Sequence, residues 1–240
     1  MFTQPVLDVS NTKIFARMDE GHQYLAYQMN FNSVEDNAMI LPIPTPRNPA
    51  EDAIKFIDFS KHPKFFDDLH QMFVEQSRSM TLGYTKGLTR TLEVHNVGNF
   101  RATFVPTIAD FERVDKQFKF DESVWNKLPQ YIDWSFVVFK LKPGIAKVHP
   151  MVFKFPSRYT DRVYFPTMHI HDGEIHVEEQ FDHKLYYQPE WIKSGDFNIR
   201  GWKTATTGYQ NYSGILKEKF PICQKTIEGQ YVNDDHWIMI

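Results

Sequence analysis

The fold is decided first by residues 13–29, which read KIFARMDEGHQYLAYQM. Two runs rich in strand-forming residues, Lys13–Met18 and Gln23–Met29, flank the segment Asp19-Glu20-Gly21-His22. A short gap of turn-forming residues between two such runs is typical of a β-hairpin. The stretch therefore predicts two antiparallel strands joined by a tight turn.

The same strand–turn–strand pattern recurs along the chain. Asn37–Ile43 runs into a proline-rich segment and is predicted to be an edge strand, because proline cannot donate to a sheet ladder. The Asp172-Gly173 pair supplies the residues that a type I′ hairpin turn prefers. Hairpins are accordingly predicted for Thr89–His95 with Asn99–Val105, Trp134–Lys142 with Ile145–Phe155, and Val163–His171 with Glu174–Phe181.

Helices are predicted in few places. Pro63 to Gln76 carries an apolar stripe at helical spacing, and Asp121 is a suitable N-cap for a helix that ends near Pro129. A shorter helix is expected over Ala50–Asp58. We therefore predict an α+β fold, mostly antiparallel sheet, sandwich-like or strongly curved, with two or three short helices. Because there is no internal repeat and no Gly/Ser-rich linker, residues 1–240 are expected to form a single domain.

Composition excludes several classes of protein. With 240 residues, 42% hydrophobic, the chain has enough apolar surface to fold, and one cysteine cannot form an internal disulfide. Twenty-seven basic against 30 acidic residues show no basic excess, so nucleic acid is not an expected partner. No apolar stretch is long enough for a membrane helix, and residues 1–10 lack the pattern of a signal peptide. A cytoplasmic location is therefore expected.

Familiar catalytic motifs are missing from the sequence. It contains no phosphate-binding glycine loop, no G-x-S-x-G, no H-E-x-x-H and no C-x-x-C. Cys223 has only Lys225 as a nearby cation, and reactive thiolates need an electropositive, accessible setting. Cys223 is thus expected to be inert, and whether the protein is an enzyme stays open at this stage.

Histidines gather in the segment 167–183. In the predicted hairpin His169 faces His176, and one side of the hairpin presents His169, His171 and His176 with Glu174 and Glu178. Opposed residues have Cβ atoms about 4.5–5.5 Å apart, so imidazoles and a carboxylate can share one transition-metal ion. The predicted metal-site residues are His169, His171, His176, Glu178 and His183.

The histidine cluster also has two interpretations that need no metal. A hairpin with one face in water shows the same alternation, since histidine and glutamate are ordinary surface residues. Clustered histidines beside carboxylates also titrate near neutral pH and would make a pH-sensitive surface.

Aromatic residues are mixed with polar and glycine residues over Lys184–Tyr212, a composition that can anchor a protein partner. The candidate partner-binding residues are Tyr186, Tyr187, Trp191 and Trp202, with the sheet edge near Asn37–Ile43 as a second surface. The sequence favours a non-catalytic binding or assembly protein with a protein partner or a second copy of itself. The alternative is a metal-dependent enzyme or metal-binding protein that uses the 167–183 hairpin.

Overall fold

The predicted hairpin of residues 13–29 is confirmed and lies at the centre of the molecule. Strands β1 (Asp8–Asp19) and β2 (His22–Ser33) pair antiparallel, with Asp19 opposite His22. The two turn residues, Glu20 and Gly21, have φ angles of 49° and 74°, as a type I′ turn requires. This computed structural model describes residues 1–74, 96–97, 100–120, 122–147, 149–172, 174–189, 202–205, 212–218 and 220–240.

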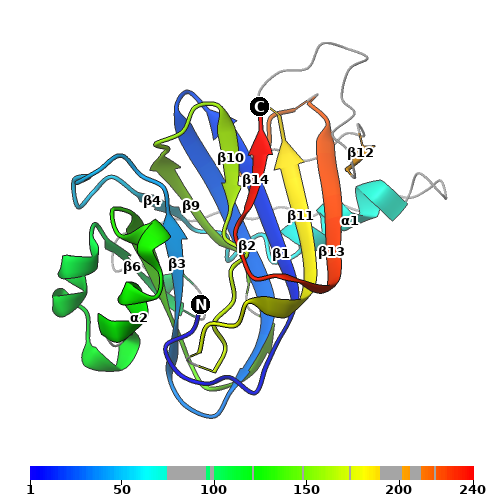
Figure 1. Ribbon diagram of the computed structural model, residues 1–240. Helices are drawn as coiled ribbons and strands as arrows, with labels where there is room; N and C mark the ends of the chain where they lie inside the picture. The colour runs from blue at the N-terminus through cyan, green and yellow to red at the C-terminus, as the bar shows by residue number, and fades with distance from the viewer. Residues whose placement is uncertain are drawn as a thin grey trace.

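A large sheet is built on both sides of this hairpin (Figure 1). Its strands follow the order β12-β13-β11-β1-β2-β9-β4, and β8 also pairs with β2. The pairing is antiparallel except between β1 and β11, which run parallel. The further strands are β4 (Lys55–Ile57), β8 (Gly144–Lys147), β9 (Met151–Pro156), β11 (Glu178–Gln188), β12 (Lys203–Ala205) and β13 (Ile222–Val232).

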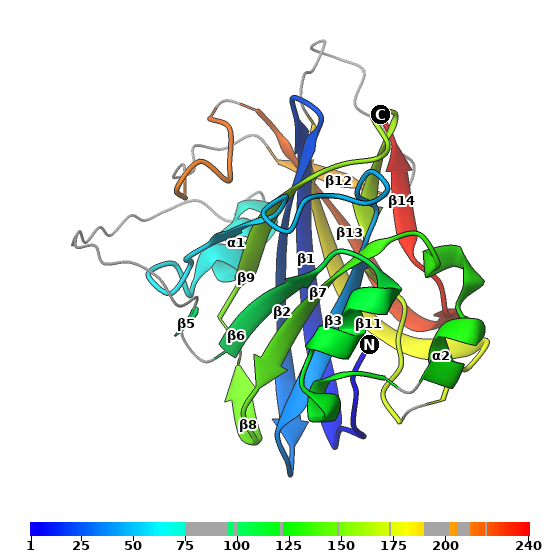
Figure 2. The same ribbon diagram turned by 90° about the vertical axis from the view of Figure 1, so that its left-hand side faces the viewer.

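A smaller sheet packs against one face of the large one (Figure 2). Its order is β3-β7-β6-β5, so the strand predicted at Asn37–Ile43 is confirmed and ends the sheet. A separate two-stranded ladder joins β10 to β14. The bounds are β3 (Asn37–Ile43), β5 (Asn96–Val97), β6 (Phe100–Val105), β7 (Ser135–Leu141), β10 (Arg162–Phe165) and β14 (His236–Met239).

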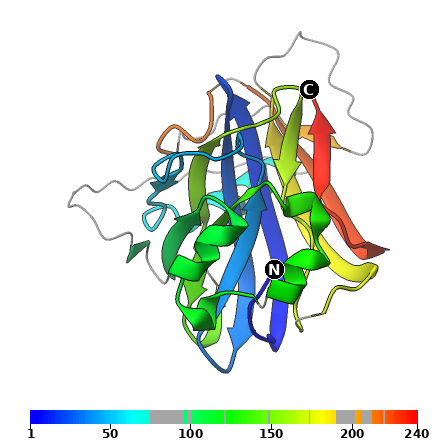
Figure 3. The ribbon, with the colours of Figure 1, turned by 60° about the vertical axis from the view of Figure 1, so that its left-hand side comes forward.

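Short helices cover the outer faces of the two sheets. Helix α1 (Phe65–Val74) lies on the large sheet, and α2 (Glu122–Asn126) lies with short 3-10 segments over the small sheet (Figure 3). Both helices were predicted, but the helix expected over Ala50–Asp58 is wrong, because this segment holds strand β4. The 3-10 segments are Ile108–Arg113, Lys116–Phe118 and Pro129–Tyr131. No helix among the described residues is long and apolar enough to span a membrane.

Three apolar clusters follow from this layering. The largest lies between the sheets, where Ile14, Leu25 and Phe153 of the large sheet meet Leu41 and Phe139 of the small one. A second fills the space under α2 and the 3-10 segments, and a third lies under α1. The protein is thus mostly β-strand with few helices, as predicted, and the face-to-face sheets are compatible with the sandwich-like expectation.

Two predicted hairpins are wrong. β7 pairs with β3 and β6, whereas β8 and β9 pair with β2, so the chain crosses between sheets at Pro143-Gly144. β10 pairs with β14, and β11 pairs with β1 and β13, so Val163–His171 and Glu174–Phe181 do not pair with each other. Partners distant in sequence replaced the local ones in both cases. The strand expected at Thr89–His95 lies outside the described residues.

The inter-sheet core should be sensitive to truncation. Phe139 is fully buried, and its ring meets those of Phe56 and Phe153 at 6.2 and 6.1 Å. We expect Phe139→Ala to lower the free energy of unfolding by about 3–5 kcal/mol, because a large buried cavity replaces the ring. Urea unfolding measures the change. Ile132→Ala, at an exposed position, is the matched control, and an equal loss in both variants would contradict the assignment of the core.

Candidate functional site

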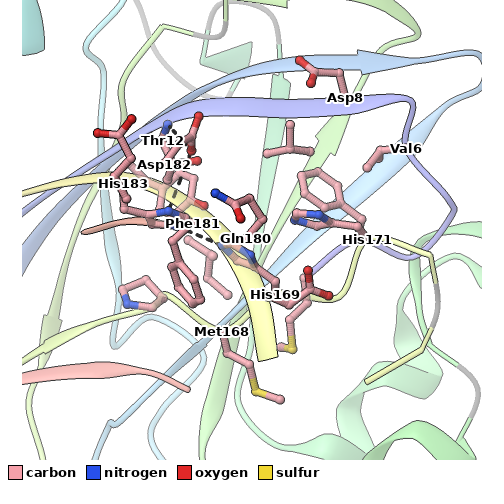
Figure 4. Close-up of a pocket in the computed structure, with 18 of the residues that line it drawn as sticks. Val6, Asp8, Thr12, Met168, His169, His171, Gln180, Phe181, Asp182 and His183 are labelled. Atoms are coloured by element: carbon pink, nitrogen blue, oxygen red, sulfur yellow. Dashed lines mark hydrogen bonds and ion pairs between the residues drawn. The ribbon is translucent and has the colours of Figure 1, made fainter. Parts of the chain in front are cut away.

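A cavity of about 400 Å³ opens where the parallel pairing of β1 and β11 begins (Figure 4). It is bounded by the chain segments 1–2, 6–9 and 166–171 and by residues 179–183 of β11. Three of the four histidines in the predicted cluster, His169, His171 and His183, line this cavity. We take it as the candidate functional site.

A bulge in β1 shapes one wall of the cavity. The register between β1 and β2 shifts between Ser10 and Lys13, and Asn11 has a φ angle of 54°. This irregularity directs the backbone N–H groups of Asn11 and Thr12 toward the carboxylate of Asp182 on β11. Bulges of this kind re-aim groups beside functional sites, and here the bulge ties β1 to β11 at the cavity.

The C-terminal residues hold the opposite wall in place. The Asn233 side chain accepts a hydrogen bond from the backbone N–H of His169 at 2.7 Å and donates to its carbonyl at 2.9 Å. Asp235 accepts hydrogen bonds from the hydroxyls of Tyr131 and Tyr164 and from the backbone N–H groups of Thr167 and Met168. Because the backbone of 167–169 is held by these side chains, the position of His169 depends on residues 64–68 positions away.

The histidines of the cavity contact one another directly. Nε2 of His169 lies 3.1 Å from Nε2 of His183, and the ring of His171 stacks on that of His169 with centroids 4.7 Å apart. His169 and His183 are 7% and 1% exposed, and neither Nδ1 has a hydrogen-bond partner among the described residues. One imidazole of the pair must donate and the other accept, so the two rings cannot both be cations, and their low pKa values make both neutral at neutral pH.

Burial accounts for this neutrality. It lowers the pKa of His169 to about 2, with the neighbouring His183 and His171 acting in the same direction. Burial likewise lowers the pKa of His183 to about 3 and that of His171 to about 4. At neutral pH the three side chains are therefore uncharged hydrogen-bonding groups.

The other two predicted metal-site residues lie apart from this pair. His176 is exposed and bonds to Asp172 Oδ2 at 3.0 Å, an interaction that raises the pKa of His176. Glu178 lines a neighbouring surface depression together with His171 and His176. The predicted opposition of His169 and His176 is wrong, since the hairpin that would create it does not form.

The structure does not support the predicted transition-metal ion. Within the described ranges, no group of three or more His, Cys, Asp or Glu side chains is placed to hold a metal ion. The cavity does bring together His169, His171 and His183, but the first two are stacked face to face instead of converging on one point.

The described aromatic residues that were predicted to bind a partner do not form an exposed patch. Tyr186 and Tyr187 are buried in the core, on opposite faces of β11. Trp202 is half-buried against the inter-sheet core, and Trp191 lies outside the described residues. Contact of either tyrosine ring with a partner would require it to leave the core.

Sequence reasoning missed a different surface, the outer edge of β13. β12 covers only Ile222–Gln224 of this strand, and within the described ranges no strand pairs with the outer edge of residues 225–232. The edge ends beside three exposed apolar side chains, Val177, Tyr231 and Val232, which are 82%, 49% and 64% exposed. The run of strand-forming residues at 222–232 was the available signal, but the free edge arises only from the order of the strands.

Comparison with solved structures identifies proteins with a similar fold. The fold is a β-rich architecture that also occurs in solved structures of a viral protein. No protein-family model matches the chain. The viral protein is baculovirus P35. Its crystal structure has a TM-score of 0.50 with this chain at 13% identity, covering 97% of this chain and 96% of P35. A mutated P35 after caspase cleavage gives a TM-score of 0.52 at 13% identity, covering 96% and 99%.

The buried histidines should make the free energy of unfolding decrease as the pH falls below neutrality. Their folded-state pKa values lie below the ordinary 6.5, so the unfolded chain binds more protons below that pH. The stability they contribute is complete above pH 6.5 and is lost as pH falls toward 3, at up to about 1.4 kcal/mol per pH unit for each histidine. Urea unfolding between pH 7 and 4 measures this slope.

Substitution should separate the buried histidines from the exposed one. His183→Gln is expected to flatten the acid slope, with His171→Gln as a second variant if the first does not fold. His176→Gln is the control, because the side chain of His176 is exposed and its pKa is raised, so His176 does not contribute to the loss of stability in acid. The same steep slope in His183→Gln and in the unaltered protein would show that other groups cause the loss.

Proposed function

We propose that this chain is a non-catalytic protein-binding protein that holds a partner polypeptide along the edge of β13. The observation that carries the proposal is the outer edge of residues 225–232, which no strand of the described part of the chain pairs with, beside the exposed side chains of Val177, Tyr231 and Val232. An extended polypeptide can add to such an edge, where backbone hydrogen bonds supply affinity and side-chain contacts supply specificity.

The surroundings of the edge favour this use. Unprotected strand edges promote unwanted association, and soluble proteins commonly shorten, charge or cover them. At the opposite end of the large sheet the edge strand β4 has three residues, whereas β13 continues for eight residues, 225–232, past its pairing with β12. Gly229, with a φ angle of 113°, leaves the middle of the edge without a side chain, and Tyr231 and Val232 follow it.

The described side chains favour binding over catalysis. Burial raises the pKa of the Cys223 thiol to about 12, which leaves it a poor nucleophile. The pKa values of His169 and His183 lie several units below neutrality, so neither is tuned for general acid–base work at neutral pH. These groups are better suited to shaping a surface than to proton transfer.

Selection from a random peptide library displayed on phage tests the proposal. We expect enriched peptides with strand-forming sequences, and at least tenfold weaker binding to a Tyr231→Lys, Val232→Lys double variant, because charge at an edge opposes strand addition. Fluorescence anisotropy with the synthetic peptides measures the affinities.

The matched control carries the same charge change elsewhere. Met239→Lys alters an exposed apolar side chain of β14 and should leave the affinities unchanged. Failure to enrich any peptide, or equal binding to the double variant and the unaltered protein, would refute docking at this edge.

A second candidate function comes from the shared fold. Because a P35 structure of similar fold was obtained after caspase cleavage, we infer that a caspase is a candidate partner of this chain. In this candidate function the chain is bound and cut by the protease, as the solved P35 was cut.

Incubation with purified caspases tests this second candidate. We expect a single cut in the chain, seen by intact mass. A caspase whose catalytic cysteine is replaced by alanine is the control and should make no cut. An uncut chain beside a caspase that cleaves a fluorogenic peptide would contradict this candidate.

A further inference from the structure

The histidine cavity is surrounded by uncompensated negative charge. Its lining includes the carboxylates of Asp8, Glu179, Asp182 and Glu228, and no lysine or arginine is among the described residues that line it. None of the four forms an ion pair with a lysine or arginine within the described part of the chain. The adjoining depression extends this charge with Glu178 and the pair of Asp172 and His176.

The other titratable groups of the cavity do not cancel that charge at neutral pH. Burial lowers the pKa of the Met1 α-amino group to about 5, so the amine is uncharged. His169, His171 and His183 are uncharged for the same reason. Asp182 accepts backbone hydrogen bonds from the β1 bulge, and none of its recorded partners is a lysine or arginine side chain.

A second and independent feature is the pair of unpartnered ring nitrogens. His169 and His183 line the cavity, each is more than nine-tenths buried, and Nδ1 of each has no hydrogen-bond partner in the described structure, although Nδ1 of His183 lies 3.9 Å from Oδ1 of Asp182. Because their Nε2 atoms share one proton, the ring that donates keeps an unprotonated Nδ1. The accepting ring carries its proton on Nδ1, and the Asp182 carboxylate beside Nδ1 of His183 favours that proton there, which leaves the free lone pair on Nδ1 of His169. A buried acceptor without a partner is unfavourable until a donor reaches it.

The remaining walls are mostly apolar, with Thr12 and Gln180 as polar members. Phe2, Val9 and Phe181 line the same cavity. A ligand with an apolar stem and a cationic head that donates hydrogen bonds matches all three features. Lysine and arginine side chains have this form, since they bury their methylene stems and keep the charged head near polar groups.

We propose that this cavity receives a lysine or arginine side chain of the partner polypeptide. The inference rests on the proposed function in taking the ligand to be a polypeptide. Glu228 connects the two sites, because it lines the cavity and lies on β13. The carboxylates attract the cationic head, and the imidazole pair accepts a hydrogen bond from it.

The experiment uses small probes, so that it does not depend on docking at the β13 edge. Nα-acetyl-arginine methylamide and its citrulline analogue, which is nearly isosteric and uncharged, are titrated into protein with ¹³C-labelled histidine rings. We expect the arginine probe to shift the His169 and His183 resonances saturably and to bind at least about tenfold tighter than citrulline, as a charge-assisted hydrogen bond predicts. Added salt should weaken binding of the arginine probe.

Variants locate the charge that is recognised. Glu179→Gln with Glu228→Gln should weaken arginine binding by roughly threefold or more, since exposed charge pairs each contribute modestly. Glu112→Gln, an exposed carboxylate in Ile108–Arg113, is the matched control and should have no effect. Unfolding curves of each variant confirm that it folds.

The outcomes separate this inference from the proposed function. Absence of saturable shifts, or equal binding of arginine and citrulline, overturns the cavity assignment while leaving peptide docking at the β13 edge intact. Zinc uptake at the same histidines that excludes the arginine probe also overturns it, in favour of a metal site. Loss of peptide docking with retained arginine binding refutes the proposed edge and leaves the cavity as a cation site.

Discussion

The parallel pairing of β1 with β11 is the constraint on which the rest of the molecule depends. It sets Lys13 opposite Lys184 and Arg17 opposite Gln188, and so joins the N-terminal hairpin to the C-terminal half of the large sheet. Parallel strands need a long crossover, and here more than a hundred residues intervene. Those residues form the small sheet, the short helices and the other half of the large sheet.

The histidine cavity is a consequence of how that pairing begins. Before Lys13 the register of β1 is broken by the bulge at Asn11, and before Lys184 the strand β11 continues outward to pair with β13 alone. The two strands diverge at this point, so the segment 166–171 and the N-terminal residues close the space between them. Asp182 marks the point of divergence, since it accepts the backbone N–H groups of the bulge.

Local signals predicted the parts of the fold that local forces determine. The turn at Glu20-Gly21 and the strand at Asn37–Ile43 could be identified because turn chemistry and β propensity act within a few residues. Val163–Phe181 carried equally strong local signals and was still predicted wrongly. Its backbone is held by Asn233 and Asp235, and no short-range pattern encodes partners so far along the chain.

The same limit divides what could be predicted of the site. Clustering in sequence identified His169, His171 and His183, and the structure does bring these three together. Their environment could not be predicted, because the number of neighbouring carboxylates suggested easily charged histidines on a solvated face. The edge of β13 that no described strand covers could not be predicted either, since it depends on which strands lie beside it.

The separation of charge from neutral polar groups explains how acidic residues and uncharged histidines coexist. Carboxylates one or two residues away would raise a histidine pKa if they shared its environment. Here desolvation outweighs them, because Asp8 and Glu228 are exposed to water while His169 and His183 are buried. Asp8 and Glu228 therefore lie at the water-exposed mouth, and the neutral imidazoles keep their lone pair inside. A cation on an apolar stem is stabilised by the carboxylates at the mouth and by the imidazole lone pair inside. An anion is repelled by the carboxylates before it reaches the imidazoles.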